Sequence, residues 1–503
     1  MSETQNFYKP EKLIDDSNNT HNTVAILGEG GQGRVVTTTV SSIAIKFTLD
    51  EDSRAPITDV KLVQQYKRQV QKILTLPIPS HLPITIPKAP LRDRVGYTME
   101  MLPNMKSWKD TFSLKQHQSE LDDWPQFYVN NLPDSNPNTI ELVSNWVAYA
   151  STGSAKRRLF ALYKASLILQ ELHSRGILYG DVSDNNIYID QKDINTIWFI
   201  DADNLRYDSS RRLGGFQTEG FGAPELNSEP YEYHIESDCH SFAVLAFLTL
   251  TGTHPFLSGE TIQNAEENDW EQEGTVTMEV LAAMGGVPWI GDENDTSNSS
   301  HGMFDRNNVI SSKLYQLFDQ TFTNGRNATW TRPSIFHWTK YLIQAHDTHI
   351  KCPTCLMSFD ASHLSSCCWC KSPAPKTIQI RSFTIHNEKS IDDCTENWVY
   401  ILPISQKQSE HTYHLPRRIF FPFEGTRSNE TFLTLIHKKG KSTIKKTSTS
   451  LEMTFQNGRR PSKIAPTSVW RTTSKQINNK YPCSIYTPKF KRLITIVGLN
   501  VHS

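Results

Sequence analysis

The sequence predicts an α+β protein with a two-lobed body, a cysteine-rich segment and a small β-rich domain. Short alternating apolar runs fill about the first hundred residues, and longer helical patterns follow as far as residue 346. Four of the eight cysteines then fall in two CxxC pairs. From residue 376 the chain is rich in Thr, Ile, Lys and Arg and alternates again.

Length and composition indicate a globular protein of several domains. The chain has 503 residues, of which 37% are hydrophobic and 21% are charged. The net charge of −1 hides an asymmetry, because residues 380–503 hold 20 Lys and Arg against 8 Asp and Glu, a balance of +12 that leaves −13 for the rest.

No run approaches the roughly 18 apolar residues that span a bilayer, and "MSETQNFYKPEKL" does not resemble a signal peptide. We therefore expect a cytoplasmic protein without membrane contact.

The first lobe is expected over residues 22–104, after a polar lead at 1–21. "NTVAILGEGGQGRVVTTTV" and "SSIAIKFTL" predict three strands, with a glycine-rich turn between the first two. A helix is expected over 58–76, closed by "LPIPSHLP", and "GYTMEML" predicts another strand.

The second lobe is expected over residues 105–346. "SAKRRLFALYKASLILQELHSRG" predicts a long amphipathic helix with Ser154 as its N-cap and Gly176 as its stop. Two short strands, "NIYID" and "TIWFID", flank a turn after it, and two more helices are expected over 241–251 and 335–344. Two segments look like insertions, an irregular one near 107–153 and a polar one near 258–303.

The segment "GEGGQGRV" and the lysine of "AIK" suggest a phosphate site. Glycines between two strands let backbone N–H groups approach phosphate oxygens, although a tight hairpin also favours glycine. Lys46 ends the next predicted strand, where its ammonium group can pair with phosphates, but a lysine at a strand end is commonly a solvated edge residue.

The stretch "LYGDVSDNNIYID" places Asp181 five residues ahead of Asn186. Phosphoryl transfer uses a carboxylate to accept or orient the proton of the attacking hydroxyl and an amide to hold a metal ion. Further on, "FIDAD" places Asp201 after an apolar strand, where a carboxylate can bind Mg²⁺. Ordinary turn residues in two unrelated loops are the alternative, but the order and spacing of all these elements favour phosphoryl transfer.

Together these motifs resemble the protein-kinase fold over residues 22–346, and within it bacterial serine/threonine kinase-like proteins with a GD(V/L)SxxN loop and a DxD metal motif. The resemblance implies ATP as the phosphoryl donor, Asp181 as the catalytic base, and Asn186 and Asp201 as Mg²⁺ ligands. The implied nucleotide-contacting residues are Gly28, Gly30, Gly31, Gly33, Val35, Ala44, Lys46, Met99, Glu100, Met101, Asn186 and Asp201.

Other roles are implied by the same resemblance. "GFGAPEL" is similar to the APE motif, so Glu225 is expected to pair with Arg332 of "TRPS". "SDCHSFAVLAFLTLTGTHPF" resembles the helix whose aspartate, here Asp238, is structural. Met99 falls at the gatekeeper position, and Glu100 and Met101 would present backbone groups to adenine.

The chain departs from the kinase pattern at several positions. Tyr179 and Gly180 stand where most kinases have His and Arg, and Ser183 replaces a lysine that neutralises the γ-phosphate. The metal motif is "DAD", so the usual phenylalanine is missing. Ser209, Ser210 and Thr218 are candidate phosphorylation sites, the alternative being plain surface hydroxyls.

The helix over 58–76 also lacks the glutamate that pairs with the lysine in kinases. Gln65 or Gln69 would have to serve as the partner of Lys46, by a neutral hydrogen bond. Asp59, the lone carboxylate, is expected to cap the helix or to favour its N-terminus.

The cysteines predict a structural zinc ribbon over 347–375. Cys352, Cys355, Cys367 and Cys370 form CxxC, eleven residues, CxxC, a spacing suited to one tetrahedral Zn²⁺. A redox pair or inert thiols are the alternatives, and Cys368 and His363 are less favoured substitute ligands. Four thiolates would leave no open position for catalysis.

The domain over 376–503 is predicted to be basic and β-rich. "HKKGKSTIKK" and "NGRRPSK" are compatible with weak contacts to nucleic acid or an acidic partner, but a solvated face or a surface docked on the acidic body is the favoured interpretation. Charge reversal of Lys445 and Lys446 would test nucleic-acid binding.

The sequence therefore predicts an ATP- and Mg²⁺-dependent serine/threonine protein kinase acting on unidentified protein substrates. A pseudokinase scaffold that binds nucleotide or a partner without transfer is the main alternative, favoured by the missing helix glutamate and Ser183. A kinase of a small molecule is the other, because the lysine replaced by Ser183 is a protein-kinase feature.

Overall fold

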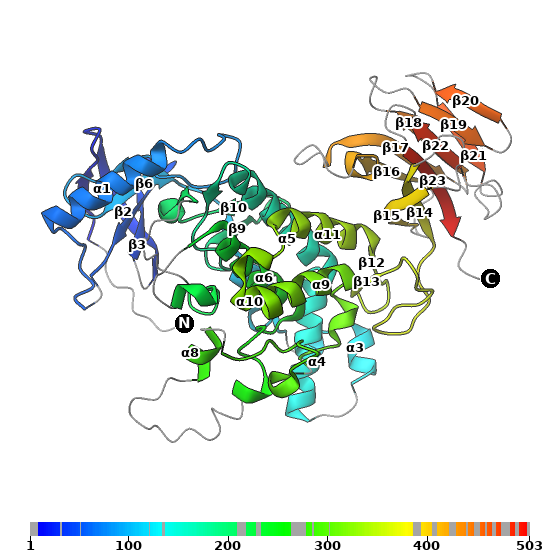
Figure 1. The fold of residues 1–503 in the computed structure, drawn as a ribbon, viewed down its shortest axis with the longest axis horizontal. Helices are drawn as coiled ribbons and strands as arrows, with labels where there is room; N and C mark the ends of the chain where they lie inside the picture. Colours follow the sequence, from blue (N-terminus) through cyan, green and yellow to red (C-terminus); the bar gives the residue numbers. More distant parts are fainter. Residues whose placement is uncertain are drawn as a thin grey trace.

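The computed structural model divides along the chain into an N-terminal sheet with one helix, a helical body and a C-terminal β region at the far end (Figure 1). It describes residues 9–499 except 31–32, 51, 120, 133–135, 209–217, 228–232, 263–277, 284–285, 301, 386–393, 405–409, 422–428, 439–440, 447–452, 458–459, 465–468, 474–482 and 488–491.

The N-terminal sheet is antiparallel, with strand order β1-β2-β3-β4-β6-β5. The strands are β1 (Lys12–Ile14), β2 (Thr20–Gly30), β3 (Gly33–Thr38), β4 (Ile43–Thr48), β5 (Ala89–Pro90) and β6 (Gly96–Glu100). Gly30 pairs with Gly33, so the glycine-rich segment closes the hairpin between β2 and β3. The strands expected from the sequence in this region are confirmed.

Helix α1 (Val60–Leu74) lies beside this sheet. The Asp59 carboxylate accepts a hydrogen bond from the Leu62 N–H at 2.9 Å, which confirms the capping role expected for it. The helix buries Val63, Val70 and Ile73 on one face. The exposed and buried faces therefore follow the helical period, and the helix ends just before the proline-rich turn.

The helical body is built on three long helices that pack together, α5 (Ser154–His173), α6 (Ile235–Thr251) and α11 (Ile335–Thr348). The other α-helices within the described residues are α2 (Trp108–Phe112), α3 (Gln126–Asn130), α4 (Pro137–Ser151), α8 (Met278–Ala283), α9 (Ser312–Asp319) and α10 (Gly325–Asn327). The π-helical turn Gln320–Asn324 joins the last two.

Two expectations for this body are wrong. The segment 107–153 is not irregular, because α4 forms its second half with Asn136 as an N-cap and a proline in the first turn. Ser154 does not cap α5, since Gly153 takes the cap position with φ 94° and Ser154 is already helical by position. The Ser154 hydroxyl instead accepts a hydrogen bond from the Ser358 N–H at 2.9 Å, which ties α5 to the cysteine-rich segment.

Short antiparallel strands hold the loops between the long helices. They are β7 (Met105–Ser107), β8 (Ile177–Leu178), β9 (Ile187–Asp190), β10 (Ile197–Phe199), β11 (Arg206–Tyr207), β12 (His349–Lys351) and β13 (Ser358–Asp360). β9 and β10 form the expected hairpin, and β7 adds a third strand that the sequence did not suggest. β8 pairs with β11.

The C-terminal region contains two antiparallel sheets, ordered β15-β14-β23-β22-β19-β20 and β16-β17-β18-β21. Their strands are β14 (Thr377–Ile385), β15 (Cys394–Pro403), β16 (Glu410–Pro416), β17 (Thr431–Lys438), β18 (Lys441–Lys446), β19 (Met453–Asn457), β20 (Arg460–Ile464), β21 (Val469–Thr473), β22 (Cys483–Thr487) and β23 (Arg492–Leu499). The β-rich character is confirmed. Lys445 and Lys446 belong to β18, but their side chains lie outside what the structure describes.

Buried apolar side chains of the described residues fall into two clusters. The small one lies in the N-terminal sheet and includes Val36, Ile45 and Phe47. The large one runs from the helical body through the cysteine-rich segment into strands β14 to β17. The protein is therefore a mixed α and β structure whose N-terminal sheet has its own core. Within the described ranges no helix is long and apolar enough to cross a membrane.

Candidate functional site

Lys46 meets two aspartates where the N-terminal sheet faces the helical body. It lies near the end of β4, with Tyr97 of β6 and Val35 of β3 opposite it on either side. Its ammonium group forms ion pairs with Asp201 and with Asp203, the latter at 3.0 Å between Nζ and Oδ2. The Lys46 side chain is only 12% exposed, so this is a desolvated contact between two distant parts of the chain.

The two aspartates belong to the loop that follows β10. Asp201 adopts a left-handed conformation, with φ 62° and ψ 54°, and a short 3₁₀ turn begins immediately after it. A non-glycine residue in this region of φ/ψ space is strained and is found more often at functional sites. This turn carries Asp203 back toward the same ammonium group.

Helix α1 contacts Asp203 from the other side. The Tyr66 hydroxyl donates to Asp203 Oδ2 at 3.3 Å, and the Gln69 side-chain amide donates to the Asp203 carbonyl oxygen at 2.8 Å. The sequence prediction for this helix is therefore wrong in detail: the carboxylate partners of Lys46 are Asp201 and Asp203, Gln69 binds the loop, and Gln65 is exposed.

Charge at this contact is unbalanced, with two carboxylates against one ammonium group. Burial, together with the neighbouring Asp203 carboxylate, raises the pKa of Asp201 to about 7. Burial acts in the same direction on Asp203, but the Lys46 ammonium and the hydrogen bonds it receives hold its pKa below the usual value. Of the two carboxylates that share one ammonium group, Asp201 is therefore the one whose ionised form is disfavoured.

Asp181 lies in a second loop, between β8 and β9, and is hydrogen-bonded on both oxygens. Oδ2 accepts from the Asn186 amide at 2.6 Å, and Oδ1 accepts from the N–H and the hydroxyl of Thr218, each at 3.0 Å. Burial nevertheless raises the pKa of Asp181, outweighing these bonds. Asn186 uses its amide nitrogen for Asp181, which leaves its amide oxygen for another ligand.

Ser183 belongs to this loop, and Thr218 contacts the loop from a later segment of the chain. The Thr218 hydroxyl oxygen also lies 3.0 Å from Ser183 Oγ, within hydrogen-bonding distance, and Ser183 is fully buried. The Thr218 hydroxyl is thus engaged inside the site rather than exposed, which argues against its role as a phosphorylation site in this conformation. Ser209 and Ser210, the other two candidates, lie outside the described residues.

Asp238 of α6 fixes the start of the Asp181 loop. Its fully buried carboxylate accepts hydrogen bonds from the N–H groups of Tyr179 and Gly180, at 2.7 and 3.0 Å, from the Tyr233 hydroxyl at 2.8 Å and contacts His173 Nε2 at 3.0 Å. Burial disfavours the ionised form, but these donors hold the pKa of Asp238 below its usual value. The structural role expected for Asp238 is therefore borne out.

The expected pair of Glu225 and Arg332 is also present. Both Arg332 terminal nitrogens donate to the Glu225 carboxylate at 2.7 Å, in the bidentate arrangement typical of strong pairs. The pair also contacts the first turn of α6, because Arg332 donates to the Glu236 carbonyl oxygen at 3.1 Å and the Ser237 hydroxyl donates to Glu225 at 2.8 Å.

The two loops are held against each other. The Ile200 N–H donates to the Asn186 carbonyl oxygen at 2.9 Å, and the Tyr179 hydroxyl donates to the Ile200 carbonyl oxygen. Gly180 has φ 92°, and a Cβ there would lie 2.9 Å from the Asn204 Cβ. The glycine therefore permits the close approach that brings the Asp181 loop beside Asp201 and Asp203.

A cavity of about 300 Å³ opens beside Lys46 and Asp201, at the lower end of the range for small-molecule sites. Eight of the nucleotide-contacting residues expected from the sequence line it: Gly28, Val35, Ala44, Lys46, Met99, Glu100, Met101 and Asp201. Its remaining lining is mostly apolar. The Met101 N–H is already used, because it donates to the Ser42 carbonyl oxygen at 3.0 Å.

The other expected residues stand as follows. Gly30 and Gly33 pair with each other at the turn end of the hairpin and do not line this cavity. Asn186 lies in the neighbouring loop beside Asp181. Gly31 lies outside the described residues.

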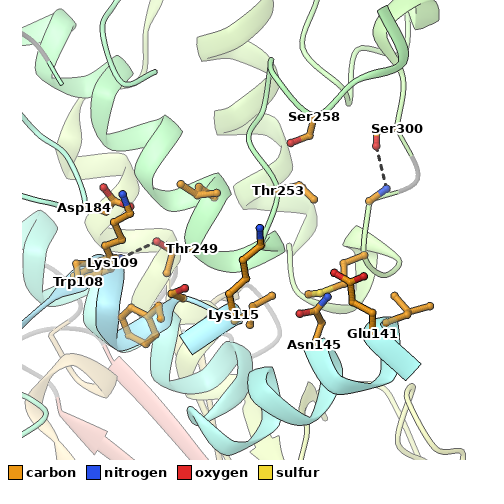
Figure 2. A pocket seen from close by; sticks show the side chains of 18 of the residues that line it. Trp108, Lys109, Lys115, Glu141, Asn145, Asp184, Thr249, Thr253, Ser258 and Ser300 are labelled. Carbon is orange, nitrogen blue, oxygen red and sulfur yellow. Dashed lines mark hydrogen bonds between the residues drawn. The ribbon is translucent and has the colours of Figure 1, made fainter. Parts of the chain in front are cut away.

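A second cavity, of about 850 Å³, lies between α2, α4 and the end of α6 (Figure 2). It adjoins the Asp181 loop through Asp184 but includes neither Lys46 nor Asp201. Lys115 extends into it between Asp184 and Glu141, as Figure 2 shows. Its lining mixes ammonium, carboxylate and apolar groups, which do not select one class of ligand.

The four cysteines of the two CxxC pairs converge at one point. The sulfur atoms of Cys352, Cys355, Cys367 and Cys370 lie within 4.8 Å of one another. Two of the Sγ–Sγ distances are 3.6 Å (Cys352 to Cys370) and 3.7 Å (Cys355 to Cys367). A tetrahedral ion with metal–sulfur bonds of about 2.3 Å requires about 3.8 Å between sulfurs, so the four atoms fit a metal such as zinc.

The backbone around the cysteines forms two matching turns. Leu356 and Lys371, each just after the second cysteine of a pair, have φ 62° and 60°. Their N–H groups donate to the carbonyl oxygens of Cys352 and Cys367 at 3.1 and 2.9 Å. Cys368 and His363, the alternative ligands, do not belong to the cluster.

The sequence did not predict that Asp203, Tyr66 and Thr218 contribute contacts to the site. Asp203 had one signal, its place as the second carboxylate of "DAD".

A scan of the chain against models of known protein families found no match, and a search of the curated proteins found none either.

Proposed function

We propose that the chain is an ATP- and Mg²⁺-dependent phosphotransferase with a protein-kinase-like fold, acting on a serine or threonine hydroxyl of a protein. In this proposal residues 22–104 are one lobe and residues 105–346 the other. The observation that carries it is the meeting of Lys46 from the sheet with Asp201 and Asp203 from the helical body, at the edge of a cavity lined by the expected residues.

Each group suits one part of the chemistry. The cavity between β2, β4 and β6 would take adenine, and Lys46 would hold phosphate oxygens. Asp201 and the Asn186 amide oxygen are the kinds of ligand that Mg²⁺ prefers, and bound Mg²⁺ would neutralise charge on the phosphates. Asp181, held in place by Thr218 and Asn186, would accept the proton of the attacking hydroxyl.

A nucleotide-binding scaffold without transfer is the second candidate. It is favoured by the double ion pair of Lys46, because two carboxylates compete with phosphate for its ammonium group. Ser183 adds to this, since no cation stands at its position next to Asp181. Retention of Asp181, Asn186 and Asp201 in hydrogen-bonded positions favours transfer over the scaffold.

Transfer of labelled phosphate from ATP tests the proposal. Purified full-length chain is incubated with radiolabelled ATP and Mg²⁺, alone and with a mixture of protein substrates. We expect incorporation that falls at least 100-fold in Asp181→Asn, which removes the proton acceptor, and in Asp201→Ala, which removes the proposed metal ligand.

The matched control is Asp122→Asn, an exposed carboxylate on the helical body, which should behave as the wild type. Equal incorporation by wild type and both site variants would reject the assignment of the site. Nucleotide binding without incorporation would favour the scaffold.

We further propose that the four-cysteine cluster holds a structural zinc ion. Thiolates are soft ligands that favour zinc, and all four positions of a tetrahedral ion would be filled by protein. The cluster lies in the same apolar core as the helical body, so its role would be to fix the fold rather than to catalyse a reaction.

A further inference from the structure

We propose that Asp203 is the permanent counter-ion of Lys46, held by helix α1, so that Asp201 can exchange its contact with Lys46 for a divalent cation. The inference rests on the proposed function and gives it a positioning residue. It concerns the most serious departure from the kinase pattern, the absence of any carboxylate in α1 between Val60 and Leu74.

The contacts of the two aspartates differ. Asp203 accepts three hydrogen bonds from outside its own loop. Its carboxylate accepts from the Lys46 ammonium at 3.0 Å and from the Tyr66 hydroxyl at 3.3 Å, and its carbonyl oxygen accepts from the Gln69 amide at 2.8 Å. Asp201 bonds with Lys46 and with its neighbour Asp203, and among the described residues no hydrogen bond or ion pair joins it to α1. Asp203 is therefore fixed on two sides, and Asp201 on one.

Their positions differ in the same way. Asp201 lines the cavity beside Lys46, and Asp203 does not. The Asp201 side chain is also the more exposed of the two, at 25% against 17%. A cation that enters through the cavity thus reaches Asp201 first, while the bond between Lys46 and Asp203 can persist behind it.

Helix α1 is therefore connected to Lys46 indirectly, through the loop that carries Asp203. A glutamate on α1 would reach Lys46 directly, whereas here α1 grips the loop that carries both aspartates. Tyr66 and Gln69 lie three residues apart, so they project from one face of the helix toward that loop. Movement of α1 would shift the counter-ion and the proposed metal ligand together.

The Mg²⁺ dependence of nucleotide binding tests this arrangement. Binding of ADP to the full-length chain is measured by calorimetry over a range of Mg²⁺ concentrations. In Asp203→Asn, Lys46 keeps only Asp201 as a carboxylate partner, so Mg²⁺ must take Asp201 from a lysine that has no other carboxylate left to bind. We expect the Mg²⁺ concentration for half-maximal binding to rise at least tenfold, with binding restored at saturating Mg²⁺ and little change in melting temperature.

Three companion variants separate positioning from other roles. Asp201→Asn should remove the Mg²⁺ dependence itself, Gln69→Ala should raise the Mg²⁺ requirement several-fold, and Gln65→Ala, an exposed glutamine on the same helix, should change nothing. A wild-type Mg²⁺ requirement in Asp203→Asn would overturn the proposal. So would behaviour identical to Asp201→Asn, because Asp203 would then be a metal ligand.

A second readout does not depend on nucleotide. If the wild type binds no ADP at any Mg²⁺ concentration, the proposed function fails, and hydrogen exchange then decides the inference alone. We expect the amides of α1 to exchange at least fivefold faster in Asp203→Ala than in the wild type or Gln65→Ala. Unchanged exchange in α1 would overturn the proposal.

Discussion

Gly176 and Gly180 flank the short strand β8 and both have positive φ, but their surroundings differ. A Cβ on Gly176 would meet nothing within 4 Å. A Cβ on Gly180 would lie 2.9 Å from Asn204 Cβ and 3.1 Å from its carbonyl oxygen. Comparing alanine variants at the two positions therefore distinguishes the cost of backbone strain from the cost of disturbing the close contact between the two loops of the site.

We expect Gly176→Ala to lower the free energy of unfolding by about 1 kcal/mol, the cost of left-handed strain. Gly180→Ala should cost about 2 to 4 kcal/mol, because overpacking against Asn204 is added to that strain. Denaturant unfolding of the two variants measures the difference. Equal losses would show that the contact between the loops is not tight.

Site residues that belong to a short sequence motif were predictable, and those that depend on long-range packing were not. Lys46, Asp181, Asn186 and Asp201 each stand in a short motif next to a strand, and the structure places them around one region. The contact of Asp203 with Tyr66 spans 137 positions and depends on how α1 packs, which no local pattern encodes.

At the scale of elements, the cysteine segment joins the helical body through ordinary core contacts. Ser154 at the start of α5 accepts from the Ser358 N–H, and the Tyr128 hydroxyl donates to the Cys355 carbonyl oxygen at 2.9 Å. Loss of a metal from the cysteine segment should therefore also lower the stability of the helical body.

Cys367→Ser should lower bound zinc from about one ion per chain to near zero, because three thiolates leave the tetrahedral site incomplete. We also expect a lower melting temperature. Elemental analysis of the purified protein, followed by thermal unfolding, measures both. Cys368→Ser is the matched control, since Cys368 is next in sequence but outside the cluster, and zinc loss in that variant would contradict the ligand set.

Strands and long helices were predictable because their periodicity is strong, as in β2 to β4, α1 and α5. The errors arose where tertiary contacts decide. Ser154 carries the residue type of a cap, yet its hydroxyl is taken by β13. Helix α4 has a weakly amphipathic sequence within a polar segment, so only its packing against the body reveals it.

At the scale of the whole molecule, a buried ion pair ties the helical body to the C-terminal sheets. Asp347 at the end of α11 accepts from Arg418 at 2.7 Å on each oxygen, and Trp398 of β15 donates to it at 2.9 Å. Asp347 and Arg418 are 1% and 4% exposed. Burial disfavours the charged carboxylate, but Arg418 outweighs it and lowers the pKa of Asp347 to about 2.

Asp347→Asn should lower the free energy of unfolding by about 3 kcal/mol at neutral pH, because Arg418 is left buried without its partner. Since the folded pKa is depressed, this contribution is present above the ordinary carboxyl value of 3.8 and is lost as the pH falls toward 2. Unfolding of both proteins across this pH range should show the difference shrinking.

The exposed pair of Arg381 and Glu396 in the same sheets is the control for that comparison. Glu396→Gln should cost less than about 1 kcal/mol, because water screens an exposed pair. A loss as large as that of Asp347→Asn would contradict the anchoring role of the buried pair.

The most direct test of the whole account is a crystal structure with Mg²⁺ and a non-hydrolysable ATP analogue. We predict adenine in the cavity beside Met99, phosphate oxygens on Lys46, and a metal ion on Asp201 and Asn186, with Asp203 still bonded to Lys46. A nucleotide bound elsewhere, or phosphates that contact neither Lys46 nor an ion on Asp201, would contradict the account.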